Sequence, residues 1–138
     1  TKLMIHGDTM APTAKLLLLG TVLMCLCSCM TAPKNIPENA TVEELTLLGQ
    51  QSLDISNYKA AEVYYSTIIK RFGSDITVLV AAEYEIAHIR VKQKKWDEAD
   101  EMLKRIVSYY EGTEAGLLPP HYKKLALIDL DKIPQGDN

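Results

Sequence analysis

Residues 58–72 read YKAAEVYYSTIIKRF, and residues 96–110, which lie 38 positions later, read WDEADEMLKRIVSYY. When the chain is shifted by 38 residues, positions of similar size and polarity coincide over both of these segments and upstream of them. The coinciding positions are Leu48-Gly49 with Ile86-Ala87, Tyr58 with Trp96, Ala61 with Ala99, Tyr65 with Leu103, Ile68-Ile69 with Ile106-Val107, and Phe72 with Tyr110. Generic amphipathic helices would tolerate many other offsets, so this agreement indicates an internal repeat.

Each repeat is expected to contain two helices. Residues 41–44, TVEE, have the form of a capping box, which predicts a helix that begins there. Apolar residues then recur at helical spacing until Asn57 interrupts the pattern, and residues 58–72 form a second amphipathic segment that Gly73 closes. Because the connection between the two helices is so short, we expect them to run antiparallel.

The repeated positions resemble the tetratricopeptide repeat. In the first helix of each pair, that family has a large residue followed by a small one, as in Leu48-Gly49 and Ile86-Ala87. In the second helix it has an aromatic residue, an alanine three positions later and a large residue four positions further on, as in Tyr58-Ala61-Tyr65 and Trp96-Ala99-Leu103. The resemblance covers residues 42–112 and implies that the small side chains allow close helix packing.

The chain departs from the usual form of this repeat in three respects. Its period is 38 residues rather than about 34. The proline that commonly ends a unit is replaced by Gly73 or Glu111, and the early aromatic residue of the first helix is Leu45 in one copy and Glu83 in the other. The longer period resembles a subclass found in bacterial envelope lipoproteins, including the repeat subunit of the outer-membrane β-barrel assembly machinery, in which segments like residues 65–72 are common.

These patterns predict an all-α fold with two tetratricopeptide-like helix-turn-helix repeats and one C-terminal capping helix. Pro119-Pro120 mark a position where a helix can begin, and an apolar stripe continues from there to about Asp131. The predicted helical domain therefore spans residues 41–132, and residues 133–138 form a flexible tail. Since repeat stacks usually need about three units, two repeats and a cap are a minimal stack, which leaves open an oligomer in which another subunit completes part of the core.

The N-terminal residues 1–28 are predicted to be upstream sequence and a signal peptide. Lys15 precedes eleven uncharged residues, too few to span a bilayer, which needs roughly 20. The run ends in Leu26-Cys27-Ser28-Cys29, which resembles the bacterial lipobox and implies lipidation of Cys29. Residues 1–9 precede the expected start at Met10. Residues 29–40 contain Pro33 and Pro37 and are predicted to be an extended, lipidated tether.

The cysteine-rich segment has two further interpretations. The residue before Cys27 is a leucine and the residue before Cys25 is a methionine, both too large for the small-residue position that the lipobox resemblance implies. One alternative is a buried helix with incidental cysteines, although such a helix would not need the basic flank. The other is a C-x-C-x-C metal site, although such sites need polar, folded surroundings and usually a second half.

Composition argues against several classes of function. The formal net charge is −3, and the chain has no strongly basic segment of the kind that nucleic-acid-binding proteins show. Downstream of Cys29 the sequence contains no paired nucleophile and base, no glycine-rich phosphate loop and no metal-ligand cluster, and its histidines are the isolated His88 and His121. We therefore predict that the protein is not an enzyme and has no cofactor and no catalytic or metal site.

The resemblance implies a concave groove lined by the first helix of each pair. Carried over position by position, the groove residues are Thr46, Gln50, Leu53, Tyr84, His88 and Lys92, with Val91 as an alternative to Lys92. Residues 84, 88 and 92 share one helix face because they are spaced by four. We expect this strip to contact a partner rather than the core. The alternative interpretation is a solvated face with one packed tyrosine.

The predicted function is an interaction scaffold held in the bacterial cell envelope by its N-terminal lipid, with the domain in the periplasm. Its expected partner is another envelope or outer-membrane protein, and the resemblance points to outer-membrane protein assembly. The fold alone does not determine the partner. The alternative is an accessory subunit for periplasmic uptake of small or hydrophobic molecules, which would require oligomerisation because two repeats are too few to enclose a ligand.

Overall fold

The computed structural model describes residues 30–134, and this part of the chain folds into α-helices with no strand. The helices are α2 (Val42–Asp54), α3 (Tyr58–Phe72), α4 (Ile76–Lys92), α5 (Trp96–Tyr109) and α6 (Pro120–Asp131), with a short 3-10 turn, η1 (Ala115–Leu117), before α6. The predicted all-α class, two helical pairs and a C-terminal helix are thus confirmed. The predicted signal peptide, Cys29 and the last four residues of the tail lie outside the described residues.

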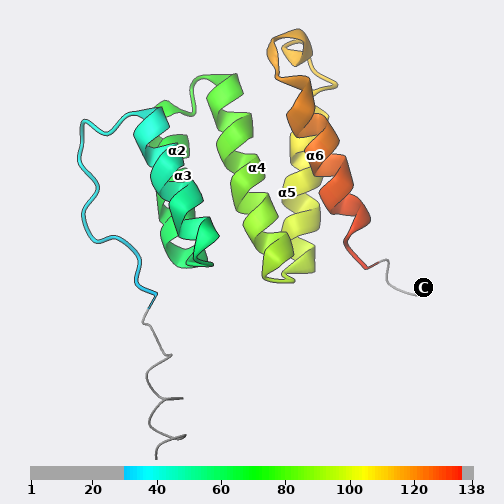
Figure 1. Ribbon diagram of the computed structural model, residues 1–138. Helices are drawn as coiled ribbons and strands as arrows, with labels where there is room; N and C mark the ends of the chain where they lie inside the picture. The colour runs from blue at the N-terminus through cyan, green and yellow to red at the C-terminus, as the bar shows by residue number, and fades with distance from the viewer. Residues whose placement is uncertain (1–29, 135–138) are drawn as a thin grey trace, which may run out of the picture.

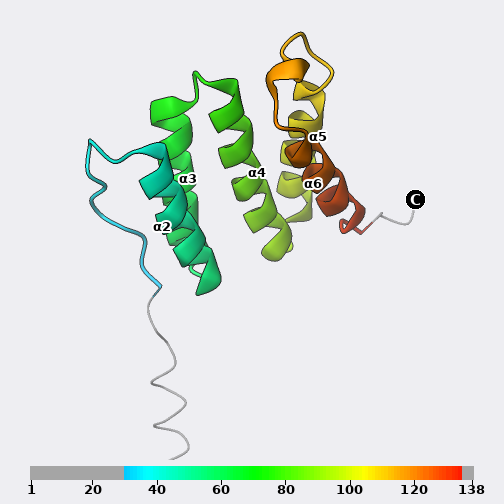
Figure 2. The ribbon, with the colours of Figure 1, turned by 45° about the horizontal axis from the view of Figure 1, so that its top comes forward.

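The helices form two layers. Consecutive helices pack against each other, and α4 also contacts α6. In Figures 1 and 2, α2, α4 and α6 follow one another across the front of the domain, whereas α3 and α5 lie behind them. The first helix of each pair therefore contributes to one common face, and the second helices form the opposite side.

The 38-residue repeat is visible in the backbone of the turns. Ser56, between α2 and α3, and Lys94, between α4 and α5, both have φ of 58°, and they lie 38 positions apart. The hydrogen bonds around the two turns also match, because the amide of Asn57 donates to the carbonyl of Ser52 (2.8 Å) and that of Lys95 donates to Arg90 (2.9 Å). Left-handed residues of this kind end many helices. The two pairs thus share one turn geometry as well as one sequence pattern.

Small residues bring the paired helices close together, as the repeat pattern predicts. Ala61 and Ala99 occupy matching positions, and neither is exposed. At Gly49, a Cβ atom would lie 2.7 Å from Cζ of Tyr65, so the tyrosine ring fills the space that a side chain would need. Ala87, which corresponds to Gly49 in the second pair, is also fully buried. These contacts explain why the second residue of the repeated two-residue motif is small in both α2 and α4.

The ends of the first and last helices agree with their sequence signals. Thr41 caps α2: its hydroxyl accepts from the amide of Glu44 (3.2 Å), and the Glu44 carboxylate accepts from the Thr41 amide (2.9 Å). Helix α6 begins at Pro120, and the Tyr110 hydroxyl donates to the carbonyl of Pro119 (2.6 Å). This last bond fixes the start of α6 against the end of α5.

Residues 30–40 are extended but do not stand clear of the helices. The Arg71 guanidinium of α3 donates to the carbonyl of Pro37 (2.7 Å). Ala40 is buried in the core of the first pair, and Ile36 packs against that core. Residues 36–40 of the predicted extended tether are therefore held to the domain by apolar contacts and by hydrogen bonds from Arg71 to their backbone carbonyls.

Candidate partner-binding groove

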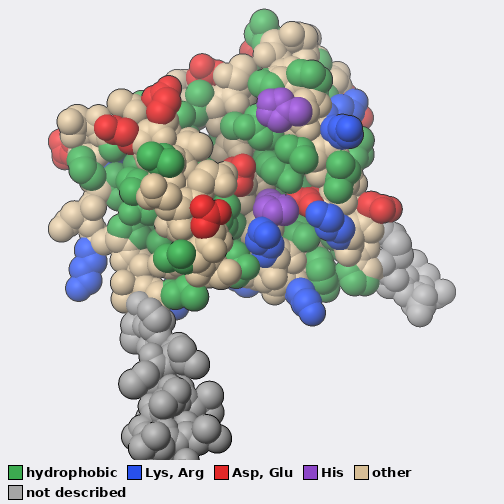
Figure 3. All heavy atoms as spheres, viewed as in Figure 1, with side chains coloured by type: hydrophobic (Ala, Val, Ile, Leu, Met, Phe, Trp, Pro, Cys, Tyr) green, Lys and Arg blue, Asp and Glu red, His purple; other side chains and the backbone are tan. Residues whose placement is uncertain are grey.

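Two adjoining hollows lie on the face formed by α2, α4 and α6. The first, which we call the apolar hollow, has a volume of about 260 Å³, and the second, the polar hollow, about 290 Å³. Glu85 of α4 lines both of them. Figure 3 shows this side of the molecule, where both histidine side chains of the described residues lie. We call the two hollows together the groove.

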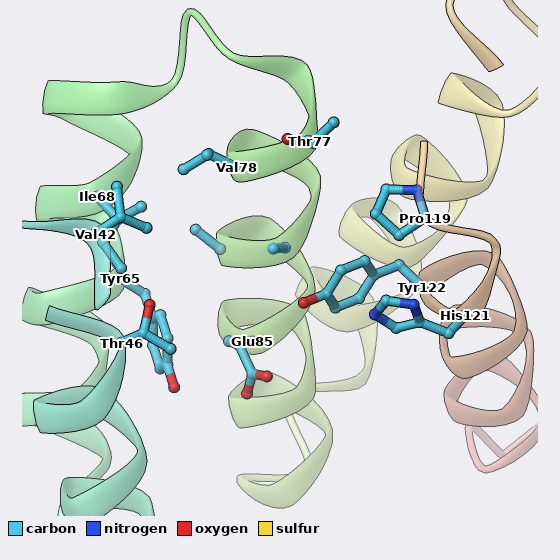
Figure 4. A pocket seen from close by; sticks show the side chains of 12 residues that line it. Val42, Thr46, Tyr65, Ile68, Thr77, Val78, Glu85, Pro119, His121 and Tyr122 are labelled. Carbon is cyan, nitrogen blue, oxygen red and sulfur yellow. The ribbon is translucent and has the colours of Figure 1, made fainter. Parts of the chain in front are cut away.

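Side chains from four helices surround the apolar hollow. In Figure 4, Thr46 and Tyr65 lie on one side, Tyr122 and His121 lie on the other, and Glu85 points into the space between them. The complete lining is Val42, Thr46, Tyr65, Ile68, Thr77, Val78, Ala81, Ala82, Glu85, Pro119, His121 and Tyr122. The lining is mostly aliphatic or aromatic, with few polar groups, which is the usual composition of a ligand-binding site.

The polar hollow brings together five of the six predicted groove residues. It is lined by Gln50, Leu53, Asp54, Tyr84, Glu85, His88 and Lys92. The sixth predicted residue, Thr46, lines the apolar hollow instead. The first helices of the two pairs therefore face a common depression, and the shared helix face expected for residues 84, 88 and 92 is present.

Tyr84 does not have the exposed position that we predicted. Its side chain is 6% exposed and belongs to the core of the second pair, together with residues of α6. The ring lies 5.7 Å from that of Tyr122 and 5.8 Å from that of His88, measured between ring centroids. The prediction that Tyr84 lies on the partner surface rather than in the core is therefore wrong, because α6 covers it.

A buried carboxylate explains how Tyr84 is held. Asp129 of α6 is 1% exposed. One of its oxygens accepts from the Tyr84 hydroxyl (3.1 Å) and lies 2.6 Å from Nδ1 of His88, and the other accepts from Lys132 (2.7 Å). Burial alone would raise the pKa of Asp129, but the hydrogen bonds from Lys132 and His88 keep it below its ordinary value. This cluster joins α6 to α4 beside the groove.

Glu85 is a partly buried carboxylate of the groove whose pKa is shifted. Burial raises its pKa above the ordinary value, while His88 and Gln50 offset part of this effect and Asp129 adds to it. The amide of Gln50 also donates to the Tyr65 hydroxyl (2.8 Å). The groove thus contains a partly desolvated carboxylate at the junction of its two hollows.

Sequence reasoning missed Glu85, His121, Tyr122 and Asp129. Two of them left a signal that we did not use: Glu85 lies between two core residues in a largely apolar helix, and Asp129 interrupts the apolar stripe of residues 125–130. An acidic residue inside an apolar run needs a polar partner. His121 and Tyr122 gave no such signal, because their part in the groove depends on how α6 docks.

The groove has few of the groups that catalysis or metal binding requires. Among the described residues, no three His, Cys, Asp or Glu side chains are close enough to hold a metal ion. The His88–Asp129 pair is an imidazole–carboxylate pair, but both oxygens of Asp129 are already occupied by donors from α4 and α6. What the arrangement offers chemically is apolar contact, hydrogen bonding and a few charged side chains, namely Asp54, Glu85 and Lys92.

Comparison with known proteins gives one informative relative. The chain is 38% identical over 126 residues to an uncharacterized protein of Treponema pallidum (strain Nichols), and the aligned region covers 91% of this chain and 50% of that protein. The chain thus spans about half the length of this relative. No protein family matches the chain, and no solved structure matches it. Within residues 30–134, none of the helices is long and apolar enough to cross a membrane.

Proposed function

We propose that this protein is an envelope-anchored interaction scaffold of the tetratricopeptide type, which binds a segment of another envelope protein in the groove. The setting that the repeat resemblance implies is outer-membrane protein assembly. The observation that carries this proposal is the groove itself, a depression lined by α2, α4 and α6 that mixes apolar surface with a few polar groups. Such a surface suits an extended or helical peptide segment. The mature protein would have no catalytic role.

Position-specific crosslinking tests the groove. With a photoreactive amino acid at Thr46 or Lys92, which line the two hollows, we expect a crosslinked partner in cells. The matched controls are Ser66 and Glu101, which are exposed on α3 and α5 in the layer behind the groove. Crosslinks that form from the control positions and not from the groove positions would show that the partner binds the opposite side.

The predicted N-terminal lipid anchor is tested by an experiment separate from the crosslinking. We propose that lipidated Cys29 is the N-terminus of the mature protein, which places the described domain in the periplasm. Metabolic labelling with a fatty-acid analogue should label the wild type and Cys27→Ala but not Cys29→Ala. Label that persists in Cys29→Ala and disappears in Cys27→Ala would show that Cys27 carries the lipid.

A small-molecule accessory role is the second candidate. The observation in its favour is the mostly apolar lining of the apolar hollow, which side chains from four helices surround. Its volume of about 260 Å³ lies below the range of roughly 300–1,000 Å³ that holds drug-sized ligands. Native mass spectrometry separates the candidates, because an uptake subunit should retain a bound molecule or assemble into an oligomer, whereas the scaffold should appear as a ligand-free monomer.

A further inference from the structure

Glu85 differs from the other partly buried carboxylates of the described chain because it has no ion-pair partner there. Glu62 pairs with Arg90. Glu83, two residues before Glu85 on the same helix, lies 3.4 Å from Arg105 and accepts from the Tyr109 hydroxyl (3.1 Å). Glu85 forms no comparable pair with a lysine or arginine of residues 30–134. Its charge is therefore available at the centre of the groove.

The free-energy cost of keeping the Glu85 carboxylate charged in the groove falls when a cation binds beside it. Burial raises the pKa of Glu85, which means that the groove disfavours the charged carboxylate relative to water. A cationic group bound beside it would replace the lost hydration with a charge-assisted hydrogen bond. An apolar or acidic ligand at the same place would leave the carboxylate uncompensated or repel it.

The walls of the apolar hollow favour the same kind of ligand. Tyr122 of α6 lines the space into which Glu85 points, whereas Tyr65, on the opposite side, is a core residue that is only 1% exposed (Figure 4). Aromatic rings attract cations, and they do so more strongly for a guanidinium, which is weakly hydrated and stacks on the ring. The hollow of about 260 Å³ is smaller than a typical site for a drug-sized molecule, so its size suits one long side chain.

We propose that the groove recognises an arginine side chain of the bound peptide, which enters the apolar hollow and places its guanidinium against Glu85 and the ring of Tyr122. This inference rests on the proposed function and names the chemistry of the segment that the scaffold would bind. The aliphatic part of the arginine side chain would contact the apolar lining, for example Val78 and Ala81.

The test uses a pair of probe peptides that differ only in charge. The probes are nine-residue, end-blocked, alanine-rich peptides with a central arginine or with citrulline, its neutral counterpart of nearly the same shape. Binding to the full chain in mild detergent is measured by NMR titration at concentrations up to the millimolar range. We expect the arginine peptide to bind the wild type about tenfold more tightly than the citrulline peptide, with the largest shifts at Glu85, Thr46 and Tyr122.

A matched pair of variants shows which carboxylate is responsible. Glu85→Gln keeps the shape of the side chain but removes its charge, and it should reduce the affinity for the arginine peptide to that for the citrulline peptide. Glu101→Gln makes the same charge change at an exposed site on α5 and should leave the affinity unchanged. Thermal denaturation checks that both variants are folded, and the comparison of the two peptides on the wild type needs no variant.

The possible outcomes distinguish the two proposals. Equal binding of both peptides, with shifts in the groove, would overturn arginine recognition and leave the groove as a binding surface. A preference for arginine that survives Glu85→Gln would also overturn it, because another group would then be responsible. If neither peptide binds at millimolar concentration while crosslinks still form at Thr46 and Lys92, recognition of an arginine side chain is wrong and the scaffold remains.

Discussion

Replacing Tyr84 with alanine should lower the free energy of unfolding by about 3–5 kcal/mol, the usual cost of removing a buried aromatic side chain. The ring is 6% exposed and packs against Tyr122 of α6 and His88 of α4. The change would therefore leave a cavity between α4 and α6 and remove one hydrogen bond to Asp129. For a domain of this size, which has only a small net stability, such a loss is large.

Tyr84→Phe serves as the control for this variant. It keeps the ring and removes only the hydroxyl, so the expected loss is about 0.5–1.5 kcal/mol. Denaturant unfolding of the wild type and both variants measures the two contributions. If Tyr84→Ala kept the stability of the wild type but lost crosslinking from Thr46 and Lys92, Tyr84 would belong to the partner surface after all, as the sequence alone had led us to expect.

The repeat could be predicted because it depends on local physical rules. A small residue at Gly49 or Ala87 is required where the next helix approaches closely, and the same shift that superposes these two also superposes the turn residues Ser56 and Lys94. The start of α2 followed from a capping box whose members are only three residues apart. Each of these signals is contained in a short window of the sequence.

The docking of α6 could not be predicted in the same way. The error at Tyr84 arose because the groove positions that the resemblance implies were carried over to both pairs alike. The equivalent residue of the first pair, Thr46, does line the apolar hollow. In the second pair, Asp129 of α6 binds Tyr84 across 45 residues of sequence and His88 across 41. No periodic pattern encodes such contacts, since α6 belongs to a unit without a second copy for comparison.

The groove residues could be predicted from the sequence only in part. Gln50, Leu53, His88 and Lys92 were predicted from the repeat positions, and the structure brings them to one hollow. Glu85 was not predicted, because the repeat pattern assigns no role to its position, yet it is where the two hollows meet. Functional residues often break the local rule that surrounds them, and a charge within an apolar helix is such a break.

Replacing Asp129 with alanine should lower the free energy of unfolding by about 2–3 kcal/mol. The carboxylate is 1% exposed and holds Tyr84, His88 and Lys132 at once, so its removal leaves the Tyr84 hydroxyl without a buried acceptor. The loss stays below the 3–5 kcal/mol typical of a fully buried ion pair, because the side chains of His88 and Lys132 are 25% and 51% exposed and can be hydrated again.

The contribution of Asp129 to the stability of the folded protein depends on pH. The pKa of Asp129 in the folded protein lies below its ordinary value of 3.8, so the folded state binds fewer protons than the unfolded state in this range. Its contribution to stability is therefore complete above about pH 3.8 and is lost as the pH falls through the lower, folded pKa. The stability difference between the wild type and Asp129→Asn, which keeps the shape without the charge, should narrow as the pH falls below about pH 3.8.

Amide hydrogen exchange shows which helices lose stability in Asp129→Ala. Because Asp129 joins α6 to α4, Asp129→Ala should increase amide exchange in α6 first, while the amides of α3, in the other helix pair, keep most of their protection. An equal increase in all helices would mean that α6 does not detach separately and that the domain unfolds as a single unit. Faster exchange confined to α6 would show that the wall of the groove formed by His121 and Tyr122 depends on this buried carboxylate, which would make Asp129 a positioning residue for partner binding.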